Sequence, residues 1–315
     1  MKLSQLLNMF IMDNEIKGNS NRTVEVYESN IGYFVEYVGD LDLEEVTVDT
    51  IKQYQRNLLE RDFIGNSNNK PKKGKKLSRT TINTYMIHLR TFFIYLYDNG
   101  YTDIRYFDKI QVVKKPKILK EILTEEQIED VLFTFSDCML QIRNKCIFLL
   151  MVDSGLRLQE IINLKIPDIM FNSNMIKIND SKGNKDRYVP MSMASKKSLY
   201  KYITFYRVPD RLDITNVFLS KDNNVMSEKA VVSVIRRIKE KMGYKKFNPH
   251  MLRHTFATRY IINGGDMFSL QLILGHEDLS MCRKYVHLAK YYMTGDYSKI
   301  STADKIIKNN PKIKI

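Results

Sequence analysis

Residues 249–258 read Pro-His-Met-Leu-Arg-His-Thr-Phe-Ala-Thr, and this stretch decides which fold the sequence predicts. A proline suits the first turn of a helix, and Asn263-Gly264-Gly265 would end that helix. His250 and Arg253 are three residues apart, so both side chains lie on the same helical face. The stretch therefore predicts one helix that presents an imidazole and a guanidinium side by side.

The same helix also carries the spacing of a zinc site, because His250 and His254 are four residues apart. A hydrolytic zinc helix has a glutamate directly after its first histidine, and here that position is Met251. No acidic third ligand stands nearby in the sequence. The three cysteines have no paired spacing: Cys138, Cys146 and Cys282. We therefore expect no metal and no other cofactor.

Further groups that could act on a phosphate stand on both sides of this helix. Arg157 follows an almost continuous apolar stretch at residues 139–154, which predicts a buried helix. Lys182 lies in a polar turn between two predicted strands, and His276 follows Leu-Gly. Tyr285 comes nine residues after His276, on a short predicted helix. Each residue alone would be read as a surface, packing or solvated side chain, so only their joint order favours a catalytic site.

In this arrangement the sequence resembles the tyrosine recombinase (phage integrase) family. Five boxes match in the family's order over about 130 residues: Ser154-Gly-Leu-Arg-Leu-Gln-Glu160, Lys182-Gly-Asn-Lys-Asp-Arg-Tyr-Val-Pro190, Pro249–Thr258, Leu274-Gly-His276 and Tyr285-Val-His287. Gln159 stands where the family often has Ser, and the basic pair Arg283-Lys284 precedes the tyrosine. Neither departure removes a catalytic group.

The resemblance implies how these residues act on DNA. Arg157 and Arg253 would bind the non-bridging phosphate oxygens and neutralise the charge that develops in the transition state. Tyr285 would be the nucleophile, and forming its phenolate at pH 7 costs roughly 4 kcal/mol because a phenol has a pKa near 10. His250 is the expected base, and Lys182 is the expected proton donor to the leaving 5′-hydroxyl.

The remaining roles support this chemistry. His276 would hydrogen-bond or orient the phosphate, and Glu160 would hold Arg157 or His250 in place. The implied product is a 3′-phosphotyrosine with a free 5′-hydroxyl, a link that keeps the bond energy, so that religation needs no ATP. We expect His254 and His287 to be structural.

The charge of the chain indicates a nucleic-acid partner, although a solvated lysine-rich surface is an open alternative. The net charge is +14 and the pI about 9.4. Residues 1–110 carry 15 basic and 15 acidic residues, while residues 111–315 carry 35 and 21, so the whole excess of 14 lies in the second part. We expect phosphate contacts from the loop 65–77, from the linker and from one strand: Lys70, Lys72, Lys73, Lys75, Lys76, Lys114, Lys115 and Arg187.

The chain is long enough for two domains, and the predicted fold is mostly α with a small β-sheet. Residues 1–109 read as four helices, which the resemblance identifies as a SAM-like core-binding domain. Residues 110–122 form a basic linker, and residues 123–296 form an α+β catalytic domain. The tail, residues 297–315, would contact a neighbouring subunit, as the resemblance implies.

The resemblance also implies the partners: duplex DNA with inverted-repeat core sites, and a homotetramer on two such sites. A directionality factor would be an accessory partner. We expect no membrane segment, since no run of about 18 uncharged apolar residues occurs, and a cytoplasmic location. The reaction would integrate or excise a mobile element or, as in Xer systems, resolve chromosome dimers. Two alternatives remain open: a type IB topoisomerase or telomere resolvase, and a catalytically idle DNA-binding protein.

Overall fold

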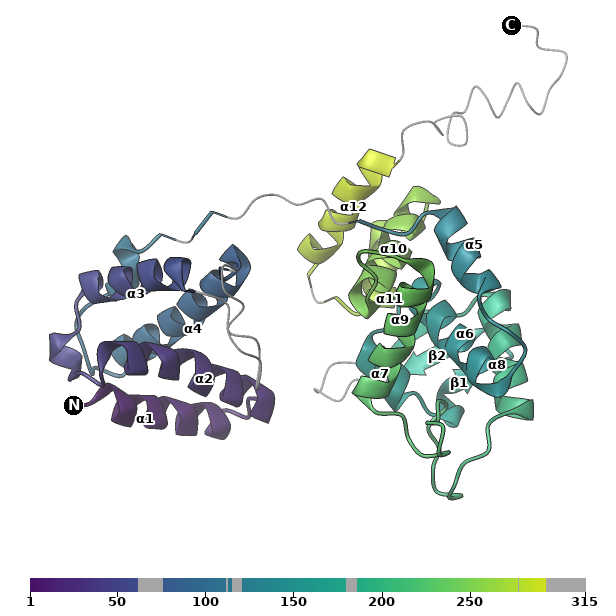
Figure 1. The fold of residues 1–315 in the computed structure, drawn as a ribbon, viewed down its shortest axis with the longest axis horizontal. Coiled ribbons are helices and arrows are strands. Elements are labelled where there is room, and N and C mark those ends of the chain that lie inside the picture. The colour runs from purple at the N-terminus through teal and green to yellow at the C-terminus, as the bar shows by residue number, and fades with distance from the viewer. Residues whose placement is uncertain (62–75, 112, 115–120, 180–185, 277, 293–315) are drawn as a thin grey trace, which may run out of the picture. The chain divides into compact units, whose positions relative to one another are not determined.

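The computed structural model describes residues 1–61, 76–111, 113–114, 121–179, 186–276 and 278–292, with side chains as far as residue 289. The chain divides into two compact units, Met1–Ile118 and Leu119–Ile315, and each has its own hydrophobic core (Figure 1). None of the helices in the described ranges is long and apolar enough to cross a bilayer. The predicted domain borders around the linker stay predictions.

The first unit contains the predicted four helices: α1 (Leu3–Ile16), α2 (Asn21–Val38), α3 (Val48–Glu60) and α4 (Arg79–Asp98). Short 3-10 helices follow α2 and α4, at Leu43–Glu45 and Tyr106–Lys109. The hydroxyls of Ser20, Thr47 and Ser78 accept hydrogen bonds from main-chain N–H groups in the first turns, so polar caps start α2, α3 and α4. Phe34, Tyr54 and Phe93 pack edge to face in the core.

The second unit is mostly helical. Its helices are α5 (Glu125–Phe133), α6 (Met139–Val152), α7 (Leu158–Asn163), α8 (Met193–Phe205), α9 (Glu228–Met242), α10 (Pro249–Ile262), α11 (Met267–Leu274) and α12 (Ser280–Tyr292), with a 3-10 helix at Ile166–Asp168. Thr124 and Gln127 form the predicted capping box of α5. The apolar helix α6 packs against α8 and α10 and is buried on nearly all sides, so it forms the centre of this unit.

A small antiparallel sheet lies beside these helices. It has the order β1-β2-β3, with β1 at Ile169–Met170, β2 at Met175–Ile178 and β3 at Arg187–Pro190. The predicted hairpin is confirmed as β2 and β3, in a register that pairs Ile178 with Arg187. Strand β1 and helix α8 were not predicted. Lys182 belongs to residues 180–185, which lie outside the described residues.

Candidate active site

Arg253 is the most deeply buried cation of the site. Its side chain comes from the first half of α10, and the residue is only 6% exposed. The guanidinium donates one hydrogen bond to the carbonyl of Gly155 and one to the carbonyl of Leu274, both at 2.6 Å. Burial, and next the charge of Arg157, lower the pKa of Arg253 to about 10, so it stays protonated at neutral pH.

Gly155 is required where it stands because its backbone has a φ of +68° and closely approaches Phe256 of α10. A Cβ at this position would lie 2.3 Å from the Phe256 ring. The turn after α6 therefore reaches Arg253 only because it lacks a side chain. The resulting main-chain conformation aims the Gly155 carbonyl at the guanidinium.

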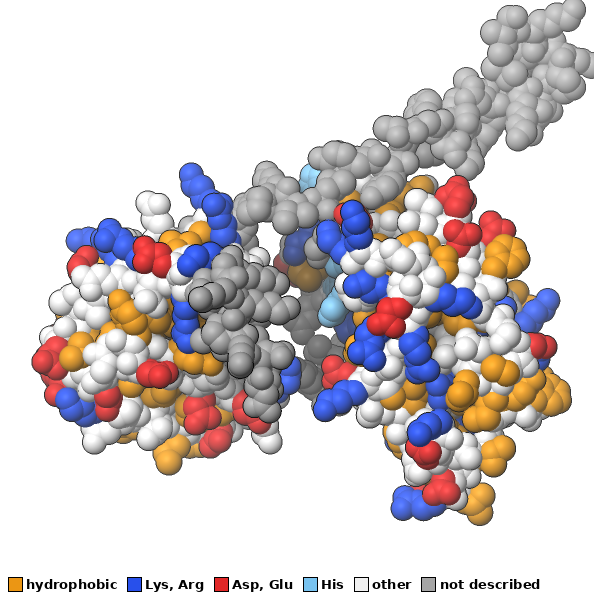
Figure 2. Space-filling model, viewed as in Figure 1, with side chains coloured by type: hydrophobic (Ala, Val, Ile, Leu, Met, Phe, Trp, Pro, Cys, Tyr) orange, Lys and Arg blue, Asp and Glu red, His pale blue; other side chains and the backbone are white. Residues whose placement is uncertain are grey.

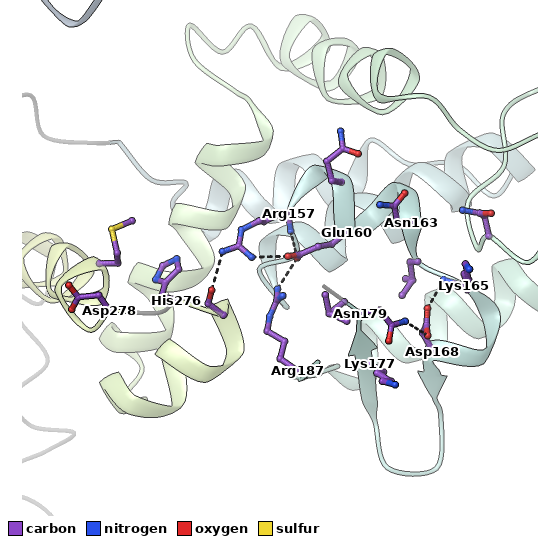
Figure 3. A pocket seen from close by; sticks show the side chains of 16 residues that line it. Arg157, Glu160, Asn163, Lys165, Asp168, Lys177, Asn179, Arg187, His276 and Asp278 are labelled. Carbon is purple, nitrogen blue, oxygen red and sulfur yellow. Dashed lines mark hydrogen bonds and ion pairs between the residues drawn. The ribbon is translucent and has the colours of Figure 1, made fainter. Parts of the chain in front are cut away.

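Glu160 joins the other two arginines of the site (Figure 3). One of its carboxylate oxygens accepts from the Arg157 guanidinium at 2.8 Å, and the other accepts from the Arg157 main chain at 2.7 Å and from Arg187 at 2.8 Å. Burial alone would raise the pKa of Glu160, but its bonds with Arg187 and Arg157 hold that pKa below the usual range. The predicted positioning of Arg157 by Glu160 is thus visible in the geometry, whereas no described contact links Glu160 to His250.

Arg157 and Arg187 differ in exposure, and this difference separates their roles. The Arg157 side chain is 40% exposed and also approaches the Gly275 carbonyl, at 3.4 Å. The Arg187 side chain is 12% exposed and donates a second hydrogen bond to the Ile273 carbonyl at 2.8 Å. Arg157 can therefore reach a phosphate. Arg187 is engaged on the protein, so this arrangement does not support the expected DNA contact.

His276 lies directly beside Arg253, with 3.4 Å between its Nε2 and a guanidinium nitrogen. Burial, followed by the charges of Arg253, Arg157 and Arg187, lowers the pKa of His276 to about 4. The imidazole is therefore neutral at physiological pH. It adds no charge to the site, and its two ring nitrogens lie 3.4 Å from a guanidinium nitrogen of Arg253 and 3.5 Å from the sulfur of Cys282.

Tyr285, on α12, lies between two histidine rings. Its ring stacks on His276 with centroids 6.3 Å apart, and its hydroxyl oxygen is 3.1 Å from Nδ1 of His254. The tyrosine is 6% exposed. Burial raises its pKa above the usual value, while Arg253 acts in the opposite direction.

His250, the expected base, is located elsewhere on α10. It is exposed in the first turn of that helix and makes no hydrogen bond to another described residue, whereas His254 contacts the tyrosine. Sequence reasoning missed His254 because spacing alone places both histidines on a shared face. Only the packing of α10 on α12 shows which of them meets Tyr285. His287 is exposed.

A groove of about 910 Å³ is lined by Arg157, Glu160, Arg187 and His276, whereas Arg253 and Tyr285 are not part of its lining. Figure 3 shows Arg157, Glu160 and Arg187 along one part of its lining and His276 along another. The lining also contains Lys165 and Lys177, of which Lys177 is paired with Asp186 at 2.8 Å, and the acids Asp168 and Asp278. The groove therefore suits an anionic ligand such as a phosphodiester. Among the described residues, no three His, Cys, Asp or Glu side chains gather in a way that could hold a metal ion.

Only part of the expected DNA-contacting set falls within the described residues. Lys114 is exposed, and Lys76 donates a hydrogen bond to the Glu60 carbonyl. The others lie outside the described ranges: Lys70, Lys72, Lys73, Lys75 and Lys115. Figure 2 shows further blue side chains over the part of the second unit that carries α9, where the basic residues are Lys229, Arg236, Arg237, Lys239 and Lys241.

Comparison with known families matches both units. Residues 121–291 match the Phage integrase family, and residues 5–112 match the Phage integrase SAM-like domain. The tyrosine recombinase XerC of Lactobacillus leichmannii is 33% identical over 229 residues, which are 71% of this chain and 77% of that protein. The tyrosine recombinase XerD of Listeria monocytogenes is 28% identical over 90% of this chain and 93% of its own length.

Solved structures share the fold at lower identity. The integrase of the transposon Tn1549, in complex with circular intermediate DNA, matches with a TM-score of 0.75 and 20% identity, over 90% of this chain and 94% of that one. A lambda integrase dimer bound to a core site matches with a TM-score of 0.71 and 18% identity, over 90% and 95% of the two chains. The predicted fold class, a helical SAM-like unit followed by an integrase-type catalytic unit, is confirmed.

Proposed function

The chain belongs to the phage integrase family of tyrosine recombinases, enzymes that cut and rejoin DNA at specific sites, and we propose that Tyr285 is its nucleophile. In the proposed step the Tyr285 hydroxyl oxygen attacks a backbone phosphorus. The bond from phosphorus to the 5′-oxygen breaks, and a 3′-phosphotyrosine forms. The phenol loses its proton and the departing 5′-oxygen gains one. Because one phosphodiester bond replaces another, no external energy source is consumed.

One observation carries this proposal: Tyr285 lies against the cluster formed by Arg253 and His276. The tyrosine ring stacks on His276, which in turn is 3.4 Å from the Arg253 guanidinium. Because backbone carbonyls fix Arg253 in place, its positive charge is already oriented before a substrate arrives. Arg157, with its exposed guanidinium, completes a pair of cations for the two non-bridging oxygens.

The other proposed roles rest on the family resemblance. Lys182, which lies outside the described residues, would give its proton to the 5′-oxygen. His276 would hydrogen-bond a non-bridging oxygen as a neutral imidazole. His250, which is exposed at the start of α10, is the base that the resemblance implies for Tyr285, although no contact among the described residues joins the two.

We further propose that the substrate is duplex DNA with inverted-repeat core sites, bound in the cytoplasm by four copies of the chain. Similar folds bound to DNA, including the Tn1549 integrase and lambda integrase, support duplex DNA as the partner. The relatives named XerC and XerD support dimer resolution as the reaction, whereas the transposon integrase supports element excision and integration. A directionality factor would be an accessory partner in the second case only.

The comparisons do not favour a topoisomerase or a telomere resolvase, because the curated relatives quoted above are recombinases. An idle DNA-binding protein is also not favoured. Arg157, Arg253, His276 and Tyr285 are all present and converge on one place in the second unit.

The test starts by selecting a binding site from duplexes randomised over two inverted arms. The selected site is then nicked beside each candidate cleavage position, so that the short cleaved strand diffuses away and the covalent adduct accumulates. We expect an SDS-stable protein–DNA band with the wild-type chain and none with Tyr285→Phe.

Tyr200→Phe is the matched control, because Tyr200 lies on α8, is 55% exposed and does not line the groove. It should form the adduct at the wild-type rate. A wild-type chain that binds the selected site but forms no adduct at any nick position would contradict the proposed function.

A further inference from the structure

We infer that His254 accepts the proton of Tyr285 during DNA cleavage, an inference that rests on the proposed nucleophilic role of Tyr285. This assigns a direct part in catalysis to a histidine outside the His-x-x-Arg pair. His254 thereby takes the role that the sequence assigned to His250.

The first argument is distance. Nδ1 of His254 is 3.1 Å from the Tyr285 hydroxyl oxygen, within the range required of a general base and its proton. The ring centroids are 5.5 Å apart and the ring planes are tilted by 50°, so the two rings are in contact as well as joined by the hydrogen bond. With the proton of the neutral imidazole on Nε2, the Nδ1 lone pair accepts the phenol O–H.

The second argument is that the two helices keep this pair together. α10 and α12 pack along their lengths, and both Tyr285 and Cys282 of α12 are buried against the second core. Arg253, the residue before His254, is fixed by the carbonyls of Gly155 and Leu274. The rotation of α10 about its axis is thereby set, and His254 points to α12.

The third argument is chemical need. Burial makes the phenol harder to ionise, although the nearby arginines partly offset this effect. A base that is already hydrogen-bonded to the hydroxyl removes the need to form a free phenolate before attack. His276, the other imidazole against the ring, cannot serve as well, because its Nε2 faces Arg253 and its Nδ1 faces the sulfur of Cys282 at 3.5 Å.

Several charged and titratable groups near His254 come from the helices that pack against α10. α12 contributes Tyr285 and Cys282, and the residue after the end of α11 contributes His276. Arg253 lies on α10 itself and Arg157 just before α7.

The test compares His254→Asn with His250→Asn on the selected, nicked duplex. The asparagine carboxamide occupies roughly the place of Nδ1 and keeps a hydrogen-bond acceptor there, but it cannot take up a proton. We expect His254→Asn to bind the duplex with wild-type affinity and to form the adduct roughly 100-fold more slowly, a typical loss for a general base.

A second substrate separates the nucleophile's proton from the leaving group's proton. In this duplex sulfur replaces the bridging 5′-oxygen at the cleavage position, so the leaving thiolate needs no proton. We expect this substrate to restore cleavage by Lys182→Ala but not by His254→Asn. With it, the wild-type rate should rise with pH and then level off once the accepting imidazole is neutral. The rate of His254→Asn should instead rise tenfold per pH unit, because hydroxide then removes the proton.

The outcomes are distinguishable. Absence of a wild-type adduct contradicts the proposed function itself. A wild-type adduct with His254→Asn within threefold of the wild-type rate, and an unchanged pH profile, overturns the inference. A slow His254→Asn that keeps the wild-type pH profile assigns His254 to packing and also overturns it. If asparagine disrupts folding, as judged by thermal unfolding, His254→Gln on the sulfur substrate provides the same pH readout.

Discussion

The substitution Arg187→Met tests whether the buried ion pair with Glu160 stabilises the second unit. Arg187 connects three elements, because it belongs to β3, pairs with Glu160 of α7 and bonds the Ile273 carbonyl of α11. Methionine keeps an apolar stem of similar length in the space beside Gly275. The change therefore removes the charge and the hydrogen bonds with little loss of volume.

The expected loss follows from the contacts that remain. Removing one partner of a buried ion pair costs about 3–5 kcal/mol when the other charge is left alone. Here Glu160 keeps two hydrogen bonds from Arg157, so its carboxylate stays paired. The loss then reduces to one charge-assisted hydrogen bond, about 1.5–3 kcal/mol, and one bond to a carbonyl, about 1 kcal/mol. We expect Arg187→Met to lower the free energy of unfolding by about 3 kcal/mol.

The chain has no tryptophan and two units, so one optical transition would not identify which unit is affected. Hydrogen exchange read by mass spectrometry on peptides of α6 reports the second unit directly. A loss of about 3 kcal/mol predicts roughly 100-fold faster exchange of the slowest amides. Arg211→Met is the matched control, because Arg211 pairs with Asp213 at the same 2.8 Å but both side chains are about two-thirds exposed. If both variants accelerate exchange equally, burial of the Arg187 pair contributes nothing and the reasoning is refuted.

Three further outcomes are expected. Gly155→Ala should lower the thermal midpoint of the second unit and abolish adduct formation, since the new Cβ would meet the Phe256 ring; a wild-type midpoint would contradict this. Tyr54→Phe should leave the first unit unchanged or up to about 1 kcal/mol more stable in urea unfolding, because the buried Tyr54 hydroxyl has no hydrogen-bond partner among the described residues; a large loss would show a hidden partner. Glu160 has a lowered pKa in the folded chain, so its contribution to stability should be complete above the ordinary pKa of a glutamate and be lost as the pH falls through the folded pKa. Glu160→Gln should flatten that part of the curve of stability against pH.

Much of the second unit could be predicted because its polar signals are local. The capping box at Thr124, the proline at the start of α10 and the short strand pair β2–β3 each depend on residues close together in the sequence. Helix α8 could not be predicted in the same way. Only Ser195, Leu199 and Tyr202 are buried among its 13 residues, so its apolar pattern is weak and its position depends on packing against α6.

The candidate site likewise has a part that the sequence predicts and a part that depends on packing. The order of the boxes indicated that Arg157, Arg253, His276 and Tyr285 belong together, and the geometry brings them into one cluster. Which side chains contact one another within the cluster depends on how the helices pack, and the spacing of residues in the sequence does not predict it. The expected DNA contact of Arg187 stays a prediction, and its burial beside Gly275 and its bonds to Glu160 and Ile273 could not be deduced from the strand pattern.

The orientation of the Arg253 guanidinium depends on two backbone carbonyls, and therefore on the positions of the helices that carry them, whether or not those helices contact DNA. Gly155 follows α6 and Leu274 ends α11, so a small shift in the end of either helix would tilt the guanidinium. Substitutions of the side chains that pack these two helices are therefore restricted by catalysis more strongly than by the stability of the fold. A core substitution that the fold tolerates can still misalign the cation, and random mutagenesis should recover inactive but well-folded variants from the interior of this unit.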